Sequence, residues 1–163
     1  WTSAGCGYRL ADRSRTQPKV TTALAIPVLK NTTTTPRIEQ ILTRALIERF
    51  SENSSMDISS DDKQGDLVLE GVVTSLNSSP ILFGQEGFAN TFLLSIQASV
   101  KIIRKSDGKV IIDMPNFLFR DQYQINPDVR HFFSEQNPAM ARIARDFAST
   151  VVALCLENLQ TID

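Results

Sequence analysis

The sequence FLLSIQASVKIIR, at residues 92–104, decides which fold the chain adopts. Over most of this stretch, apolar residues alternate with polar ones. The apolar set is Phe92, Leu94, Ile96, Ala98, Val100 and Ile102, and the polar set is Ser95, Gln97, Ser99 and Lys101. A period of two is typical of a β-strand with one buried face. We therefore expect a sheet with one polar face, and helices that cover the other face.

The residues that follow this strand predict a hairpin. Residues 105–109 read KSDGK, in which Gly108 can adopt a positive φ and Asp107 can bond to nearby backbone. The next strand is expected at 110–120. It contains Pro115, which has no backbone N–H, so we expect this strand to lie at a sheet edge or to contain a bulge.

Two earlier segments also have the character of strands. Residues 20–29 alternate Val, Leu and Ile with Thr and Ala, and residues 66–76 are rich in Leu and Val. The polar segment 51–65 between them is typical of a loop, with room for a short strand around 56–58. These segments bring the expected number of strands to four.

Two amphipathic helices complete the pattern. The first is expected to use Thr35 as its N-cap and Pro36 as its first helical residue, and the second to start near Asn137-Pro138 and to run to about Asn158. Apolar residues recur at helical spacing in both, namely Ile38, Ile41, Leu42, Ala45, Leu46 and Phe50 in the first and Met140, Ile143, Ala144, Phe147, Val151, Leu154 and Cys155 in the second.

The element order is therefore β-α-β-β-β-α. It predicts an α+β fold, a two-layer sandwich with two helices packed on one face of a mixed four-stranded sheet. The chain length fits one domain, which we expect at residues 20–163. Residues 1–19 are expected to hold the end of a signal peptide, a lipidated cysteine and an N-terminal arm.

The composition excludes several classes of protein. Of the 163 residues, 42% are hydrophobic and 21% are charged, which is ordinary for a globular domain. The net charge of -1 argues against a nucleic-acid binder, which would carry a strong basic footprint. No run of about 18 apolar residues is present, so we expect any membrane attachment to be covalent or peripheral.

The two cysteines predict different roles. Cys6 follows the small residues Ala4 and Gly5, as at the end of a lipoprotein signal peptide, although Ser3 stands where leucine is usual. We expect Cys6 to be the lipidation site, the alternative being an exposed cysteine in a flexible arm. Cys155 falls on the apolar side of the second helix, and we expect it to pack in the core.

Catalytic patterns are weak in this sequence. The lone His131 has no identifiable nucleophile and orienting acid, and there is no phosphate-binding glycine pattern. The acidic residues Asp61, Asp62 and Glu86 lie in Ser- and Gly-rich segments and lack the spacing of metal ligands. We therefore expect no enzyme activity, no catalytic residue, no metal and no cofactor.

Several short segments, taken in order, resemble the lipopolysaccharide-assembly lipoprotein family LptE, also called the rare lipoprotein B family. The resemblance covers nearly the whole chain, and most of its specificity comes from order and spacing. The matching segments are Cys6-Gly7-Tyr8-Arg9-Leu10, Ala25-Ile26-Pro27-Val28 with Asn31-Thr32, Arg44-Ala45-Leu46, Leu69-Glu70-Gly71-Val72-Val73-Thr74-Ser75, Gly108-Lys109-Val110 and the closing helix.

The resemblance implies a function. Members of this family are non-enzymatic lipoproteins at the periplasmic face of the outer membrane, where they plug the β-barrel translocon LptD and help to deliver lipopolysaccharide. The expected partners are therefore LptD, lipopolysaccharide and the membrane itself, through the lipid on Cys6. Two or more acyl chains on this cysteine would anchor the chain stably beside its partner.

The resemblance also implies basic residues that contact the anionic lipid headgroup. One is expected between the strands at 66–76 and 92–104, where this sequence has Gly84-Gln85-Glu86 and so departs from the family; Arg130 lies near the second position. We expect a lipopolysaccharide-binding cluster of Arg120, Arg130 and Lys105, because arginine contacts pairs of phosphate oxygens well.

The segment SPILFG at 79–84 contains three consecutive large apolar residues in what we expect to be a long loop. We expect Ile81, Leu82 and Phe83 to contact the barrel wall, the alternative being that they fold back over the core. Other functions remain open: an envelope lipoprotein for secretion or cell-wall synthesis, similar to the TolB N-terminal domain or to CsgG, and a small periplasmic hydrolase.

Overall fold

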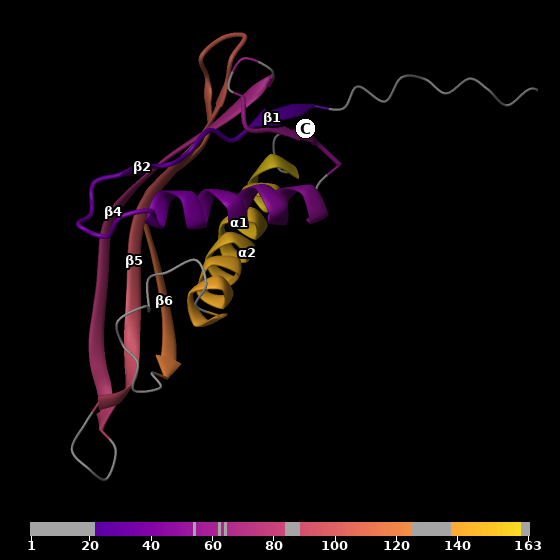
Figure 1. Ribbon diagram of the computed structural model, residues 1–163. Coiled ribbons are helices and arrows are strands. Elements are labelled where there is room, and N and C mark those ends of the chain that lie inside the picture. The colour runs from indigo at the N-terminus through magenta and orange to yellow at the C-terminus, as the bar shows by residue number, and fades with distance from the viewer. Residues whose placement is uncertain are drawn as a thin grey trace, which may run out of the picture.

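The computed structural model describes residues 22–53, 55–61, 63, 65–83, 89–124 and 138–160. In this part of the chain, two helices lie on one face of a mixed β-sheet (Figure 1). Helix α1 spans Ile38–Asn53 and helix α2 spans Pro138–Gln160. The predicted α+β class, with two helices and a mixed sheet, is confirmed.

The described sheet has six strands, so the expected number of four is wrong. Of the predicted strand at 20–29, only residues 23–25 form a strand, β1, which ends before Pro27, a residue with no backbone N–H to pair. Strand β2 follows just after the predicted range. The short strand considered around 56–58 is present as β3. The strands are β1 (Ala23–Ala25), β2 (Lys30–Asn31), β3 (Asp57–Ser59), β4 (Leu67–Phe83), β5 (Ala89–Arg104) and β6 (Val110–Gln124).

The strands have two kinds of pairing. Strand β1 pairs in parallel with β3 and with β4, and β2 pairs in parallel with β4. Strands β4, β5 and β6 form an antiparallel meander, so that the order across the sheet is β3-β1-β4-β5-β6, with β2 beside β4. Strand β6 is therefore an edge strand of the described sheet, as Pro115 predicted.

The predicted alternation along residues 92–104 is confirmed in β5. Its helix-facing residues from Leu94 to Ile102 are at most 2% exposed, whereas Gln97 and Lys101 between them are exposed. The two helices supply the other half of this core. Leu46 of α1 and Phe147 of α2 are fully buried, as expected for helices that pack on one sheet face.

The hairpin between β5 and β6 forms as predicted. Gly108 has φ 68°, and the Asp107 carboxylate accepts a hydrogen bond from the Lys109 N–H at 3.1 Å. The bulge expected at Pro115 is also present. The β5–β6 register shifts between Ala98 and Val100, whose partners are Phe117 and Met114.

The start of α1 differs from the prediction. The helix begins at Ile38, two residues after Pro36, because Arg37 has φ 66° and cannot continue a right-handed helix from the proline. The Arg37 carbonyl accepts hydrogen bonds from the Gln40 and Ile41 N–H groups. Arg37, and not Thr35, therefore occupies the N-cap position.

The strands of the meander are longer than predicted. Strand β4 continues to Phe83 and β5 starts at Ala89, so the long loop expected around residues 79–84 is wrong. Pro80 is accommodated near irregular pairing, since the β4–β5 register shifts between Pro80 and Leu82 and again before Phe83. Ile81, Leu82 and Phe83 lie at the end of a strand.

Candidate functional site

The far end of the meander forms a distinct part of the sheet. The β4–β5 register shifts between Val73 and Ser75, and the β5–β6 register shifts between Ala98 and Val100. We call the strands beyond these shifts the distal arm, defined as residues 75–83, 89–97 and 117–124. In Figure 1, β4 and β5 continue well past both helices, and they end in this arm.

The distal arm has few charges. Its β4 and β5 segments, residues 75–83 and 89–97, contain no Asp, Glu, Lys, Arg or His, although 21% of the whole chain is charged. The charged residues of the arm are Arg120 and Asp121 of β6. A charge-poor surface loses little hydration energy when another molecule covers it, so the arm is suited to contact with a partner.

The tip of the arm exposes the three apolar residues that the sequence singled out. Ile81 is 38% exposed, Leu82 58% and Phe83 63%. They do not fold back over the end of the core, which was the alternative expectation. Large apolar side chains that are exposed next to one another mark candidate interaction sites.

Tyr123 of β6 joins the three strands of the arm. Its ring stacks on Phe92 of β5 with ring centroids 5.6 Å apart, and its hydroxyl lies 2.6 Å from the Ser78 hydroxyl of β4. Burial raises the pKa of Tyr123 above its ordinary value, and the hydrogen bond with Ser78 partly opposes this shift. The arm is thus tied together on its helix-facing side.

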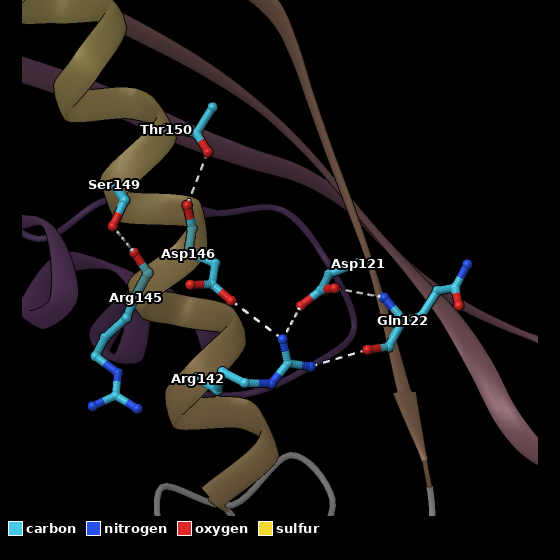
Figure 2. A network of polar contacts seen from close by, with 7 residues as sticks. All are labelled: Asp121, Gln122, Arg142, Arg145, Asp146, Ser149 and Thr150. Atoms are coloured by element: carbon cyan, nitrogen blue, oxygen red, sulfur yellow. Dashed lines mark hydrogen bonds and ion pairs between the residues drawn. The ribbon is translucent and has the colours of Figure 1, made fainter.

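Arg142 connects α2 to the arm. Its guanidinium donates hydrogen bonds to the Asp121 carboxylate at 2.6 Å, to the Asp146 carboxylate at 3.2 Å and to the Gln122 carbonyl at 2.9 Å. Figure 2 shows this group reaching from the helix to β6, whereas Arg145 on the same helix points away from the strand. We call the contacts of Arg142 with Asp121 and Gln122 the Arg142 strap.

The structure does not bring the predicted basic residues together. Arg120 is exposed on the sheet face away from the helices and pairs with Ser95, whereas Lys105 follows the other end of β5. Ser95, the partner of Arg120, and Lys105 are ten residues apart along the chain, which corresponds to about 33 Å of extended strand. Arg130 lies outside the described residues. Arg120 and Lys105 therefore cannot hold the same headgroup phosphate.

Other candidate residues lie partly outside the described ranges. Cys6, His131, Asp62 and Glu86 are not described, and Asp61 is exposed. Cys155 is fully buried in α2 as expected, and burial raises the pKa of its thiol to about 12. Among the described residues, no group of three or more His, Cys, Asp or Glu side chains could hold a metal ion.

Sequence reasoning missed the Arg142 strap and the Tyr123 cluster. No local pattern marks them, since the residues of each come from different elements. The absence of charge from residues 75–83 and 89–97 was visible in the sequence and could have identified the arm. The helices that the structure describes include none with the length and hydropathy of a membrane span.

Several solved structures are similar to this chain, and those with a TM-score above 0.5 share its fold. A protein of Xanthomonas campestris has a TM-score of 0.60 at 13% identity, with 90% of this chain and 91% of that chain covered. Lipoprotein B of Nitrosomonas europaea has a TM-score of 0.51 at 8% identity, with 86% and 89% covered. The rare lipoprotein B of Shewanella oneidensis has a TM-score of 0.49 at 17% identity, with 86% and 95% covered.

The sequence comparisons address the family directly. No curated protein matches the chain. The family model LptE, described as lipopolysaccharide-assembly, matches residues 21–153, which include every described strand and most of α2. Because this match extends over most of the chain, the protein belongs to the LptE lipopolysaccharide-assembly family.

Proposed function

We propose that this chain is a non-enzymatic lipoprotein of the outer membrane that complexes with the β-barrel translocon LptD and assists lipopolysaccharide transport and assembly. The observation that carries the proposal is the family match over residues 21–153. In this proposal the domain lies on the periplasmic side, and acyl chains on Cys6 hold it at the membrane. Neither a cofactor nor a nucleic acid takes part.

The distal arm is the proposed contact with the barrel. Its β4 and β5 segments are free of charge and its tip exposes Ile81, Leu82 and Phe83, so a partner wall can cover these two segments without desolvating an ion. The opposite side of the domain has a different character, because the outer surface of α1 carries exposed charged residues such as Arg44 and Glu48. We therefore place the arm, and not α1, against the barrel.

Among the basic residues whose structure is described, we propose Arg120 for lipopolysaccharide binding. It stands on the exposed sheet face among neutral residues, and within the described ranges it has no ion-pair partner. Arg130, which lies outside the described residues, stays part of the proposal because the family resemblance implies a basic residue near its position. Lys105 stands too far from Arg120 for one phosphate, so it would need a separate contact.

Photo-crosslinking in cells tests the barrel contact. Crosslinkers placed singly at Ile81, Leu82 and Phe83 should capture LptD, and one at Glu48 on α1 should not. Capture from Glu48 alone would reverse the docking face. Failure of every position, together with failure of the tagged chain to purify with LptD, would overturn the proposed complex.

Two further measurements test the anchor and the lipid contact. Mass spectrometry of the chain made with its native signal should find acyl chains on Cys6, and an unmodified cysteine in the membrane fraction would contradict the anchor.

Arg120→Glu should weaken lipopolysaccharide binding at low salt without lowering Tm. Lys63→Glu, at an exposed lysine outside the proposed site, is the matched charge reversal, and an equal loss for both would show a nonspecific charge effect.

A further inference from the structure

We propose that the face of the distal arm turned away from the helices holds an acyl chain of lipopolysaccharide, with the lipid phosphate at Arg120 and the hydrocarbon directed along the strands toward Leu82. This inference rests on the proposed function, because it takes lipopolysaccharide as the ligand. It adds an apolar half to the basic contact at Arg120. Three features of the arm support it: the faces on which its residues lie, their spacing, and the charges around them.

The strand pairing places Leu82 and Phe83 on opposite faces of the arm. Leu82 pairs with Thr91 of β5, and Phe83 pairs with Ala89. The extra residue between these two pairs is Asn90 on β5, so β4 itself is regular here and its side chains alternate between the faces. Leu82 is 58% exposed and Phe83 is 63% exposed. The tip therefore presents apolar surface on both faces.

Leu82 shares its face with Arg120. The pairing of β5 with β6 is regular along the arm, so Thr91, Leu93 and Ser95 of β5 lie on one face. Arg120 of β6 is the partner of Ser95. Leu82 of β4 is the partner of Thr91, and directly paired residues lie on the same face. The face turned away from the helices thus carries a cation, the partly exposed Leu93 and the exposed Leu82.

The spacing along this face fits a lipid. Four residues of β5 separate Thr91, at the level of Leu82, from Ser95, at the level of Arg120. At the rise of an extended strand, this separation corresponds to about 13 Å. A lipid whose phosphate is bound at Arg120 can therefore extend its hydrocarbon along the arm to Leu82, where both apolar groups leave water.

The level between these two ends has side chains that suit the middle of the lipid. Leu93 is flanked on its face by its two partners, Ser79 of β4 and Gln122 of β6, and both are exposed. Hydroxyl and amide side chains can donate hydrogen bonds to the carbonyl oxygens through which acyl chains join the headgroup. The order along the arm is therefore cation, hydrogen-bond donors and apolar tip, which is the order of groups in an acylated phospho-lipid.

The charges on this face direct the hydrocarbon toward the tip. Between Arg120 and the tip, the described part of the face has no charged residue. Toward the body, the same face carries exposed charges at one level of β4, β5 and β6, namely Glu70, Lys101 and Asp113. An acyl chain laid over these side chains would remove their hydration. Asp121 does not oppose the phosphate on this face, since it lies on the other face and accepts a hydrogen bond from Arg142.

Binding of two forms of lipopolysaccharide tests the acyl contact. The full chain is immobilised without LptD, and its Kd is measured for lipopolysaccharide and for the same molecule after removal of its acyl chains. Leu82→Ser should weaken binding of the acylated form about five- to tenfold, because the lipid covers a leucine that is 58% exposed in the free chain. Binding of the deacylated form should change by less than about twofold.

Phe83→Ser is the matched control, since Phe83 is similarly exposed on the opposite face, and it should leave both affinities unchanged. Arg120→Glu should weaken both forms, because both keep their phosphates. Thermal unfolding verifies that each variant is folded. No loss for Leu82→Ser, an equal loss for Phe83→Ser, or the same loss for both lipid forms would overturn the acyl site and leave the proposed function intact. An unmodified chain that binds neither form would overturn both.

Discussion

The two ends of β4 have the same backbone conformation but different surroundings. Leu67, Val68 and Leu69 are buried at the end of β4 that lies beside β1, whereas every residue from Asn77 to Phe83 is exposed. One end is therefore stabilised by side-chain packing, and the other mainly by its hydrogen-bonded ladder with β5. Core packing therefore stabilises the start of β4, and the exposed residues 77–83 at its other end are available as a contact surface.

The largest expected effect is in the body. Phe147→Ala should lower the free energy of unfolding by about 3–5 kcal/mol, because it empties a fully buried site between α2 and the sheet. Urea unfolding followed by circular dichroism measures the change. Leu118→Ala is the control, since Leu118 is 48% exposed, and it should change stability by less than about 0.5 kcal/mol. Equal losses of stability for the two variants would contradict the distinction between the packed body and the exposed arm surface.

A smaller loss is expected where the chain approaches itself closely in the body. A Cβ on Gly65 would lie 2.6 Å from the Leu67 carbonyl oxygen and 2.7 Å from the Ala25 nitrogen, and neither backbone atom can move freely. Gly65→Ala should therefore cost about 1–3 kcal/mol in the same unfolding experiment. Gly108→Ala is the comparison, because a Cβ at this exposed turn would meet no other atom within 4 Å. Any loss of stability there comes from the positive φ of 68° and not from crowding.

Within the arm, removing one hydroxyl should have a modest effect. Tyr123→Phe deletes the hydrogen bond with Ser78 and should cost about 0.5–1.5 kcal/mol at neutral pH. Because the folded pKa of Tyr123 is raised, its contribution is present below pH 10 and is lost as the pH rises through the folded pKa. The stability difference between the two chains should narrow in alkaline buffer, and a constant difference up to pH 12 would contradict this role.

The smallest effect on stability is expected at the tip. Replacing Ile81, Leu82 and Phe83 by Ser should change the free energy of unfolding by less than about 0.5 kcal/mol for each residue, since all three are exposed. The same variants should lose capture of the β-barrel partner. A large loss of stability would show that the tip belongs to the core after all.

Sequence patterns predicted the fold best where one local cause acts alone. The alternation in β5, the Gly108 turn and the Pro115 bulge each follow from the chemistry of a few adjacent residues. The extent of β4 could not be predicted, because Asn77, Ser78 and Pro80 have poor strand propensity, and pairing with β5 overrides it. The start of α1 was missed for a similar reason, since a left-handed Arg37 has no sequence signal.

The candidate site was predictable only in part. Ile81, Leu82 and Phe83 attract attention as a run of large apolar residues, and their exposure agrees with a role in contact. The separation of Arg120 from Lys105 could not be predicted, because it depends on strand register. The Arg142 strap joins residues 21 positions apart in the chain, and its geometry follows only from the packing of α2 on β6.

The bulge at Pro115 has a consequence for the behaviour of the protein at high concentration. Strand β6 lies at an edge, and a long open edge with regular N–H groups would recruit strands from other molecules and lead to aggregation. Pro115 offers no N–H, and the bulge disrupts the regular spacing of the neighbouring backbone N–H and C=O groups. The edge is therefore a poor template for polymerisation, and a chain with Pro115 replaced and the bulge removed should aggregate more readily.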